Sequence, residues 1–97
     1  MMFWSKIFKI KNHFVVAICD KELLGKNIDS AGFKVKISKH FYGGEIIDVD
    51  KAIKLMQRST ISNIIGKNIV KIAIDRNFIH KNNIILIGGI PHAQFIQ

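Results

Sequence analysis

The spacing of apolar residues changes once along this chain, and that change constrains the fold more than any other feature. Residues 6–12 and 13–19 are rich in β-branched and aromatic side chains, and in residues 33–39 apolar residues alternate with lysines. From Asp48 or Asp50 onward the apolar residues recur at helical spacing. The pattern predicts an α+β fold, with a mostly antiparallel sheet and two helices packed on one face of it.

The length of the chain predicts a single domain over residues 1–97. Two domains of half this size would each bury too little apolar surface to offset the conformational entropy lost on folding. Hydrophobic residues make up 48% of the chain and charged residues 23%, a composition that excludes intrinsic disorder.

The first half of the chain predicts three strands with lysines on their solvent side. Residues 6–12 and 13–19 are expected to form a hairpin that turns at Lys11-Asn12. The third strand is expected at 33–39, with its apolar side chains (Phe33, Val35 and Ile37) on the buried side. Asp20 is expected to cap one short helical turn between the hairpin and this strand, followed by a loop. Two strands then each present a row of lysines, which are Lys9, Lys11, Lys34 and Lys36.

The second half predicts two helices followed by a return to extended chain. The first helix starts near Asp48 or Asp50, and its buried face carries Val49, Ala52, Ile53 and Met56. The second is expected over about 61–77, capped by Ser59 or Thr60, with Gly66 inside it. After an extended run at 82–88, Gly88-Gly89 predict a turn, and Pro91 then belongs at the start or edge of a terminal strand.

The net charge of +8 predicts a polyanionic partner. The abundance of Ile, Lys and Asn is typical of an AT-rich genome, which raises lysine content without any functional cause. The same codon bias would favour glutamate, yet the chain has only Glu22 and Glu45. The shortage of acidic residues is therefore not explained by codon usage, and it favours RNA or the ribosome as the partner.

Several classes of site lack support in the sequence. Cys19 is the only cysteine, which excludes an intrachain disulfide, favours a cytoplasmic location and predicts a small buried core residue. The four histidines are not spaced like metal ligands, and the glycines do not form a phosphate-binding loop, so we expect no metal and no cofactor. The apolar runs are far shorter than the roughly 20 residues that span a membrane, so we expect no membrane association.

Two Gly-containing motifs could present side chains to a ligand. In the segment FYGGE (41–45), Phe41 and Tyr42 are adjacent, so one of them points away from the core, and we expect this to be Tyr42. In the segment IGGIPHAQ (87–94) and the residues after it, His92 and Gln94 alternate with Ala93 and Phe95. If Ala93 and Phe95 face the core, the side chains of His92 and Gln94 share the opposite face.

These motifs also carry a resemblance. The segments CDKELLGK (19–26), FYGGE, STISNIIGK (59–67) and IGGIPHAQ, in this order and spacing, resemble domain of unknown function 424, a family of small uncharacterised archaeal proteins. The likeness covers about residues 8–96. It implies an archaeal, cytoplasmic, single-domain protein and brings no established activity or catalytic residues with it. It also implies that FYGGE and GGIPHAQ are hallmarks of the family.

Three hypotheses follow from these observations. The first is a non-enzymatic, RNA-contacting or ribosome-associated module that uses Lys9, Lys11, Lys34 and Lys36 with Tyr42, His92 and Gln94. The second is a small-molecule binder or enzyme with a pocket between FYGGE and GGIPHAQ, in which His92 is the general acid/base and Glu45 its partner. The third is a homo-oligomer joined through the terminal strand. The residues of the second site are Gly43, Gly44, Glu45, Gly88, Gly89, Pro91, His92 and Gln94.

Overall fold

The amino-terminal hairpin forms as the sequence predicts. In the computed structural model, which describes all 97 residues, β1 (Met2–Ile10) and β2 (His13–Asp20) are antiparallel and pair along almost their whole length. Lys11, in the turn between them, has a φ of 54°. The predicted turn at Lys11-Asn12 is therefore confirmed.

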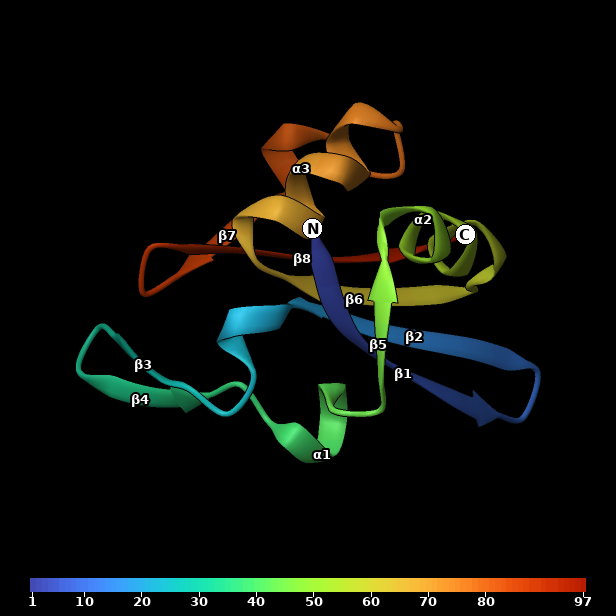
Figure 1. Cartoon of the computed structure of the whole chain (residues 1–97). Helices are drawn as coiled ribbons and strands as arrows, with labels where there is room; N and C mark the ends of the chain where they lie inside the picture. The colour runs from blue at the N-terminus through green and yellow to red at the C-terminus, as the bar shows by residue number, and fades with distance from the viewer.

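A six-stranded sheet forms the centre of the protein (Figure 1). The other four strands are β5 (Glu45–Asp48), β6 (Ile61–Ile65), β7 (Ile85–Ile87) and β8 (Ile90–Ile96). Their order across the sheet is β5-β1-β2-β6-β8-β7. Neighbouring strands are antiparallel, except that β2 and β6 are parallel. The strand β5 forms one edge of the sheet, and the other edge is formed by β7 and, beyond His92, by residues 93–96 of the terminal strand β8.

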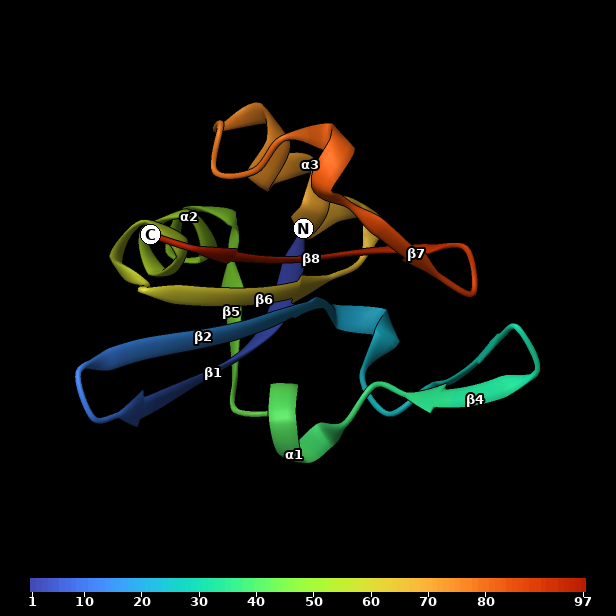
Figure 2. The same ribbon diagram turned by 180° about the vertical axis from the view of Figure 1, so that it is seen from behind.

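Two helices, α2 (Val49–Arg58) and α3 (Lys67–Asp75), cover the same face of the sheet (Figures 1 and 2). Between this face and the helices lies the larger of two apolar clusters, and the predicted α+β class is confirmed. No helix is long and apolar enough to cross a membrane. The buried members of this cluster are Phe3, Val16, Ile18, Ile47, Ala52, Leu55, Met56, Ile64, Ile69, Val70, Ala73, Ala93 and Phe95.

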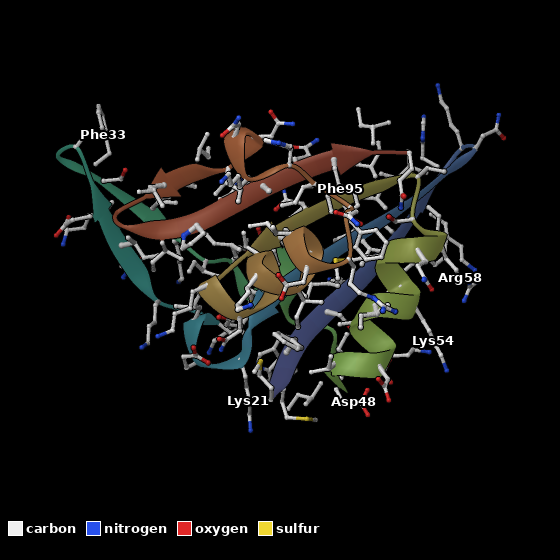
Figure 3. The ribbon with its side chains drawn as sticks, turned by 90° about the horizontal axis from the view of Figure 1, so that it is seen from above. Lys21, Phe33, Asp48, Lys54, Arg58 and Phe95 are labelled. Atoms are coloured by element: carbon white, nitrogen blue, oxygen red, sulfur yellow. The ribbon has the colours of Figure 1, made fainter.

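The helix α2 begins where the sequence predicts. The Asp48 side chain accepts a hydrogen bond from the backbone N–H of Lys51 at 2.9 Å and so caps the first turn. Ala52 and Met56 are buried and Ile53 is half-buried, while Lys51, Lys54 and Arg58 lie exposed on the opposite side. Figure 3 shows Lys54 and Arg58 projecting away from the sheet.

The second predicted helix is wrong in its first part. Residues 61–65 form β6, and α3 starts only after Gly66, whose φ is 126°. Ile61, Ile64 and Ile65 have the spacing of a helix, but they also fit a strand that is buried on both faces, with Ile64 on the helix side and Ile65 on the other. Ser59 ends α2 instead of capping a helix that follows it.

The predicted third strand is also wrong in part. The strand β4 (Phe33–Lys36) pairs only with β3 (Asn27–Ser30), in a separate hairpin that we call the arm. The helix α1 (Lys39–Tyr42) follows it, capped by the side chain of Ser38. The expected short turn is present as η1 (Lys21–Leu23), but the side chain of Asp20 makes no capping bond there. Phe33 was expected in the core and is instead 74% exposed at the arm's tip.

The face of the sheet opposite the helices is covered over only part of its area. The helix α1, the turn η1 and the base of the arm pack there on a second, smaller apolar cluster that includes Cys19, Ile28 and Tyr42. Beyond α1, beneath the end of the β1–β2 hairpin, no element covers the sheet (Figure 2). We call this uncovered part the open half-sheet.

The Gly88-Gly89 turn between β7 and β8 holds the arm in place. Both residues have positive φ angles, 55° and 82°. A Cβ atom added at Gly88 would overlap Cγ2 of Ile28 and would lie 2.5 Å from the carbonyl oxygen of Asp29, both in the arm. The missing side chain of Gly88 therefore lets the turn approach β3.

The two glycines of this turn provide an internally controlled test. We expect Gly88→Ala to destabilise the protein by about 1–3 kcal/mol beyond the effect of Gly89→Ala, because only the methyl group added at Gly88 would also overlap β3. A Cβ at Gly89 meets no atom within 4 Å, so that substitution carries only the strain of its positive φ. Urea unfolding of the two variants measures the difference, and equal losses would contradict the proposed contact.

Candidate functional site

Three polar side chains that are far apart in the sequence meet on the face of the sheet opposite the helices. The Tyr42 hydroxyl from α1 donates a hydrogen bond to Oδ1 of Asn63 on β6, at 2.5 Å. Nε2 of His92 on β8 lies 3.2 Å from the same oxygen. Tyr42 comes from FYGGE and His92 from GGIPHAQ, so the two motifs do come together, with Asn63 between them. We call these three residues the polar network.

The hydrogen-bond requirements of its neighbours fix the orientation of the Asn63 amide. If the amide were turned over, the Tyr42 hydroxyl would face an NH2 group and would lose its acceptor. His92 would then have to accept through Nε2 and carry its proton on Nδ1, which is buried without any partner. A buried N–H without a partner is less tolerable than an acceptor without one, so Oδ1 faces Tyr42 and His92.

Burial keeps His92 neutral. The loss of contact with water disfavours the charged ring and so lowers the pKa of His92 below its usual value of 6.5. The neutral ring then carries its proton on Nε2 and donates it to Asn63. A second proton on Nδ1 would leave a buried N–H without an acceptor.

The neighbouring Tyr42 and Cys19 are also uncharged at neutral pH. Burial, and secondarily the nearby Cys19, raise the pKa of Tyr42 above its usual range. Burial, and secondarily the charge of Asp20, raise the pKa of the Cys19 thiol to about 12. Neither group is activated as a nucleophile or base. The predicted role of Cys19 as a small core residue is confirmed, since it is fully buried.

Tyr42 does not point outward as the sequence analysis expected. It is 7% exposed, and its neighbour Phe41 is half-buried and stacked on Phe8, with ring centroids 5.4 Å apart. The expectation assumed extended chain at 41–42, whereas these residues end α1. Tyr42 therefore cannot stack on a nucleobase, and its role is to hold Asn63.

His92 and Gln94 share one face of β8, as predicted. Ala93 and Phe95 are buried on the side of the helices, and Gln94 is exposed on the other side. In the pairing of β6 with β8, Gln94 lies directly opposite Asn63. The sequence analysis did not select Asn63, because residues 61–65 were expected to be helical.

The predicted pairing of His92 with Glu45 is wrong. Glu45 lies on the edge strand β5, separated from β8 by β1, β2 and β6. With strands about 4.8 Å apart, the two residues are roughly 19 Å apart. Glu45 also lies on the other face of the sheet. It pairs with Ser5, and Ser5 points to the helix side because Phe3, two residues earlier in β1, does so. His92 points to the opposite side.

The glycines of FYGGE have a packing role. A Cβ on Gly43 would lie 2.5 Å from the carbonyl oxygen of Lys39, and one on Gly44 would lie 2.5 Å from that of Ser5. The two glycines thus let the chain leave α1 and pass close to β1. Pro91 lies at the start of β8, as predicted.

No surface hollow reaches the polar network. The largest, about 460 Å³, lies between β8 and residues 77–83, and a hollow of about 210 Å³ lies beside Asp20, Glu22 and Lys67. Neither these two nor the two remaining hollows are lined by Tyr42, Asn63 or His92. Gly89 and Pro91 line one hollow and Gly44 and Glu45 line another, but no hollow is lined by residues of both FYGGE and GGIPHAQ, so the expected pocket between them is not found.

The four lysines expected in one surface are divided between two hairpins. Lys9 and Lys11 lie at the end of the β1–β2 hairpin, and Lys34 and Lys36 lie on the arm. The two hairpins project at opposite ends of the molecule (Figure 1), which has a longest dimension of 36 Å. The expected lysine rows on one sheet are therefore wrong, because β4 is not part of that sheet.

The neutral state of His92 gives the protein a pH-dependent stability. The unfolded chain takes up a proton on His92 near pH 6.5, whereas the folded protein does so only at lower pH. The free energy of unfolding should therefore fall as the pH decreases below about 6.5. We expect His92→Gln, which keeps a donor for Asn63, to reduce this dependence in urea unfolding between pH 7.5 and 5. An unchanged pH profile would contradict a buried neutral His92.

The comparisons with known proteins agree with this fold. Residues 8–97 match the family described as protein of unknown function (DUF424). The chain is also similar to the crystal structure of an uncharacterised conserved protein from Methanopyrus kandleri, with a TM-score of 0.83 and 25% identity over 98% of this chain and 90% of that one. No curated protein matches. The resemblance seen in the sequence is thus confirmed over nearly the whole chain, and the protein belongs to the DUF424 family.

Proposed function

We propose that this protein is a non-enzymatic module that binds RNA in the cytoplasm through unpaired surface cations. One observation carries the proposal: among its fifteen lysines and arginines, only Lys34 and Lys71 have a carboxylate within 4.0 Å. Both of these ion pairs are exposed and therefore weak. The positive charge is thus free to interact with the phosphates of a nucleic acid.

The two hairpins place lysines where single-stranded RNA can reach them. Lys9 and Lys11 extend one end of the protein, and Lys34 and Lys36 extend the other. Phe33 lies beside the arm lysines, and its ring projects into solvent (Figure 3). Exposed aromatic rings next to lysines bind single strands, since the ring stacks on a base while the lysines contact phosphates. Phe33 takes the role that the sequence analysis gave to Tyr42.

The catalytic alternative receives no support from a specific contact. The expected acid/base partner of His92 lies on another strand and on the other face of the sheet, and no hollow opens onto His92. The oligomer alternative requires a free edge on the terminal strand, and β7 pairs only with residues 90–92, so residues 93–96 of β8 keep one unpaired edge. Binding of ribosomal RNA, and so association with the ribosome, belongs to the same RNA proposal.

The salt dependence of RNA binding tests the proposal. We expect the affinity for a fluorescent twelve-nucleotide single strand, measured by anisotropy, to fall steeply as salt rises. Replacing Lys34 and Lys36 by alanine should reduce the slope of log affinity against log salt by about 1.4, at about 0.7 for each lost phosphate contact. Replacing Lys9 and Lys11 should have a similar effect.

A charge-matched variant separates position from net charge. Lys54→Ala combined with Lys81→Ala removes the same charge from exposed positions outside the two hairpins, and it should leave the slope unchanged. Phe33→Ala should weaken binding about five- to 150-fold without changing the slope, since it removes stacking and no phosphate contact. Absent binding, or binding that does not depend on salt, would refute the proposal.

A further inference from the structure

Two amide side chains lie directly opposite each other beside α1, at the border of the open half-sheet. Asn63 on β6 and Gln94 on β8 are cross-strand neighbours on the face that the helices do not cover. Oδ1 of Asn63 is engaged by Tyr42 and His92, but its Nδ2 makes no hydrogen bond within the protein and is not buried. The Gln94 side chain is exposed and likewise makes no hydrogen bond.

The two donors on Nδ2 of Asn63 are held in a fixed direction. An exposed asparagine normally rotates and exchanges its donor and acceptor positions. Here the bonds from Tyr42 and His92 prevent that exchange, because both neighbours require the oxygen. A donor that is already oriented loses less entropy when a ligand binds, so its hydrogen bond contributes more to affinity.

The surroundings of this amide pair are apolar on one side and carry no negative charge. Next to Asn63 and Gln94 on the same face lie Ile61 and Ile96, and the row continues through Val15 to Phe8. Ile96 is 74% exposed. The strands β1, β6 and β8 contain no Asp or Glu, and on this face β1 carries Lys6, whereas Lys9 points to the helix side. The surface therefore attracts an anionic ligand that also has a flat apolar face.

We propose that Asn63 and Gln94 form a binding site for an unpaired nucleobase of single-stranded RNA, and that Tyr42 and His92 are positioning residues that orient Asn63. The base lies against the apolar row, and the Asn63 amide donates to a carbonyl oxygen on its edge. Uracil has two such oxygens and adenine has none, so the site should prefer uracil. This inference rests on the proposed function, because the lysines supply the contacts to the RNA backbone.

A single substitution tests the donor role while retaining the network. Asn63→Asp keeps an oxygen for Tyr42 and His92 and replaces the free NH2 group by a second, charged oxygen, so the readout is the preference between two strands of equal charge and not the affinity itself. With U12 and A12 as probes, we expect the wild-type protein to prefer U12, and we expect Asn63→Asp and Gln94→Ala each to reduce this preference about five- to tenfold. Asn82→Asp, the same chemical change at an exposed residue of η2 (Lys81–Asn83), should leave the preference unchanged.

The preference for U12 over A12 tests the two positioning residues, because a purely structural role would change the affinity for both strands equally. Tyr42→Phe should lower the preference for U12 without lowering the affinity for A12, because only His92 then holds the Asn63 amide in its orientation. His92→Gln should retain the preference, since the glutamine amide can still donate to Asn63. In nuclear magnetic resonance spectra of the folded protein, uridine monophosphate should shift the side-chain amide signals of Asn63 and Gln94.

The possible results separate this inference from the proposed function. Salt-dependent binding without a preference for U12, or a preference that survives Asn63→Asp, would overturn the base site and leave the RNA-binding proposal in place. Failure of the wild-type protein to bind either strand would overturn both.

Discussion

The buried carboxylate of Asp20 connects the end of β2 to the start of α3, and the arrangement of the central strands depends on this contact. It is 1% exposed, and its two oxygens accept the backbone N–H groups of Asn68 and Ile69, each at 3.0 Å. Burial raises its pKa, and the hydrogen bonds from the backbone N–H groups of Asn68 and Ile69 oppose this effect. The contact needs Gly66, where a Cβ would overlap the carboxyl group of Asp20. It joins the end of β2 to the start of α3, and so holds β6 parallel to β2.

Hydrophobic periodicity predicted the elements that depend on local pattern. The β1–β2 hairpin, α2 and the β7–β8 turn each carry a signal within a few residues, such as the Asp48 cap or the Gly88-Gly89 pair. Periodicity failed at β6, because three isoleucines within five residues fit a buried strand and a buried helix equally well. It also failed to assign β4, because alternation indicates a strand but does not indicate which strand it pairs with.

The candidate site shows the same division. His92 and Gln94 were predicted from alternation along β8, which is a local property of the sequence. Asn63 was missed, because its role depends on Tyr42 from α1 and on the pairing of β6 with β8, and neither leaves a local signal. Tyr42 was selected for the wrong reason: it supports the site from within instead of contacting a ligand. Phe33 was missed because an apolar residue in an alternating strand is normally buried.

The parallel pairing of β2 with β6 also has a kinetic consequence. It joins residues 15–19 to residues 61–65, and the connection between them contains β3, β4, α1, β5 and α2. The β1–β2, β3–β4 and β7–β8 hairpins instead join segments that are close in the sequence. Closing such a long loop costs entropy before its contacts form, so we expect the centre of the sheet to assemble after the hairpins. The oriented amide of Asn63 then exists only in the completed fold, and a partly folded chain presents the lysines without it.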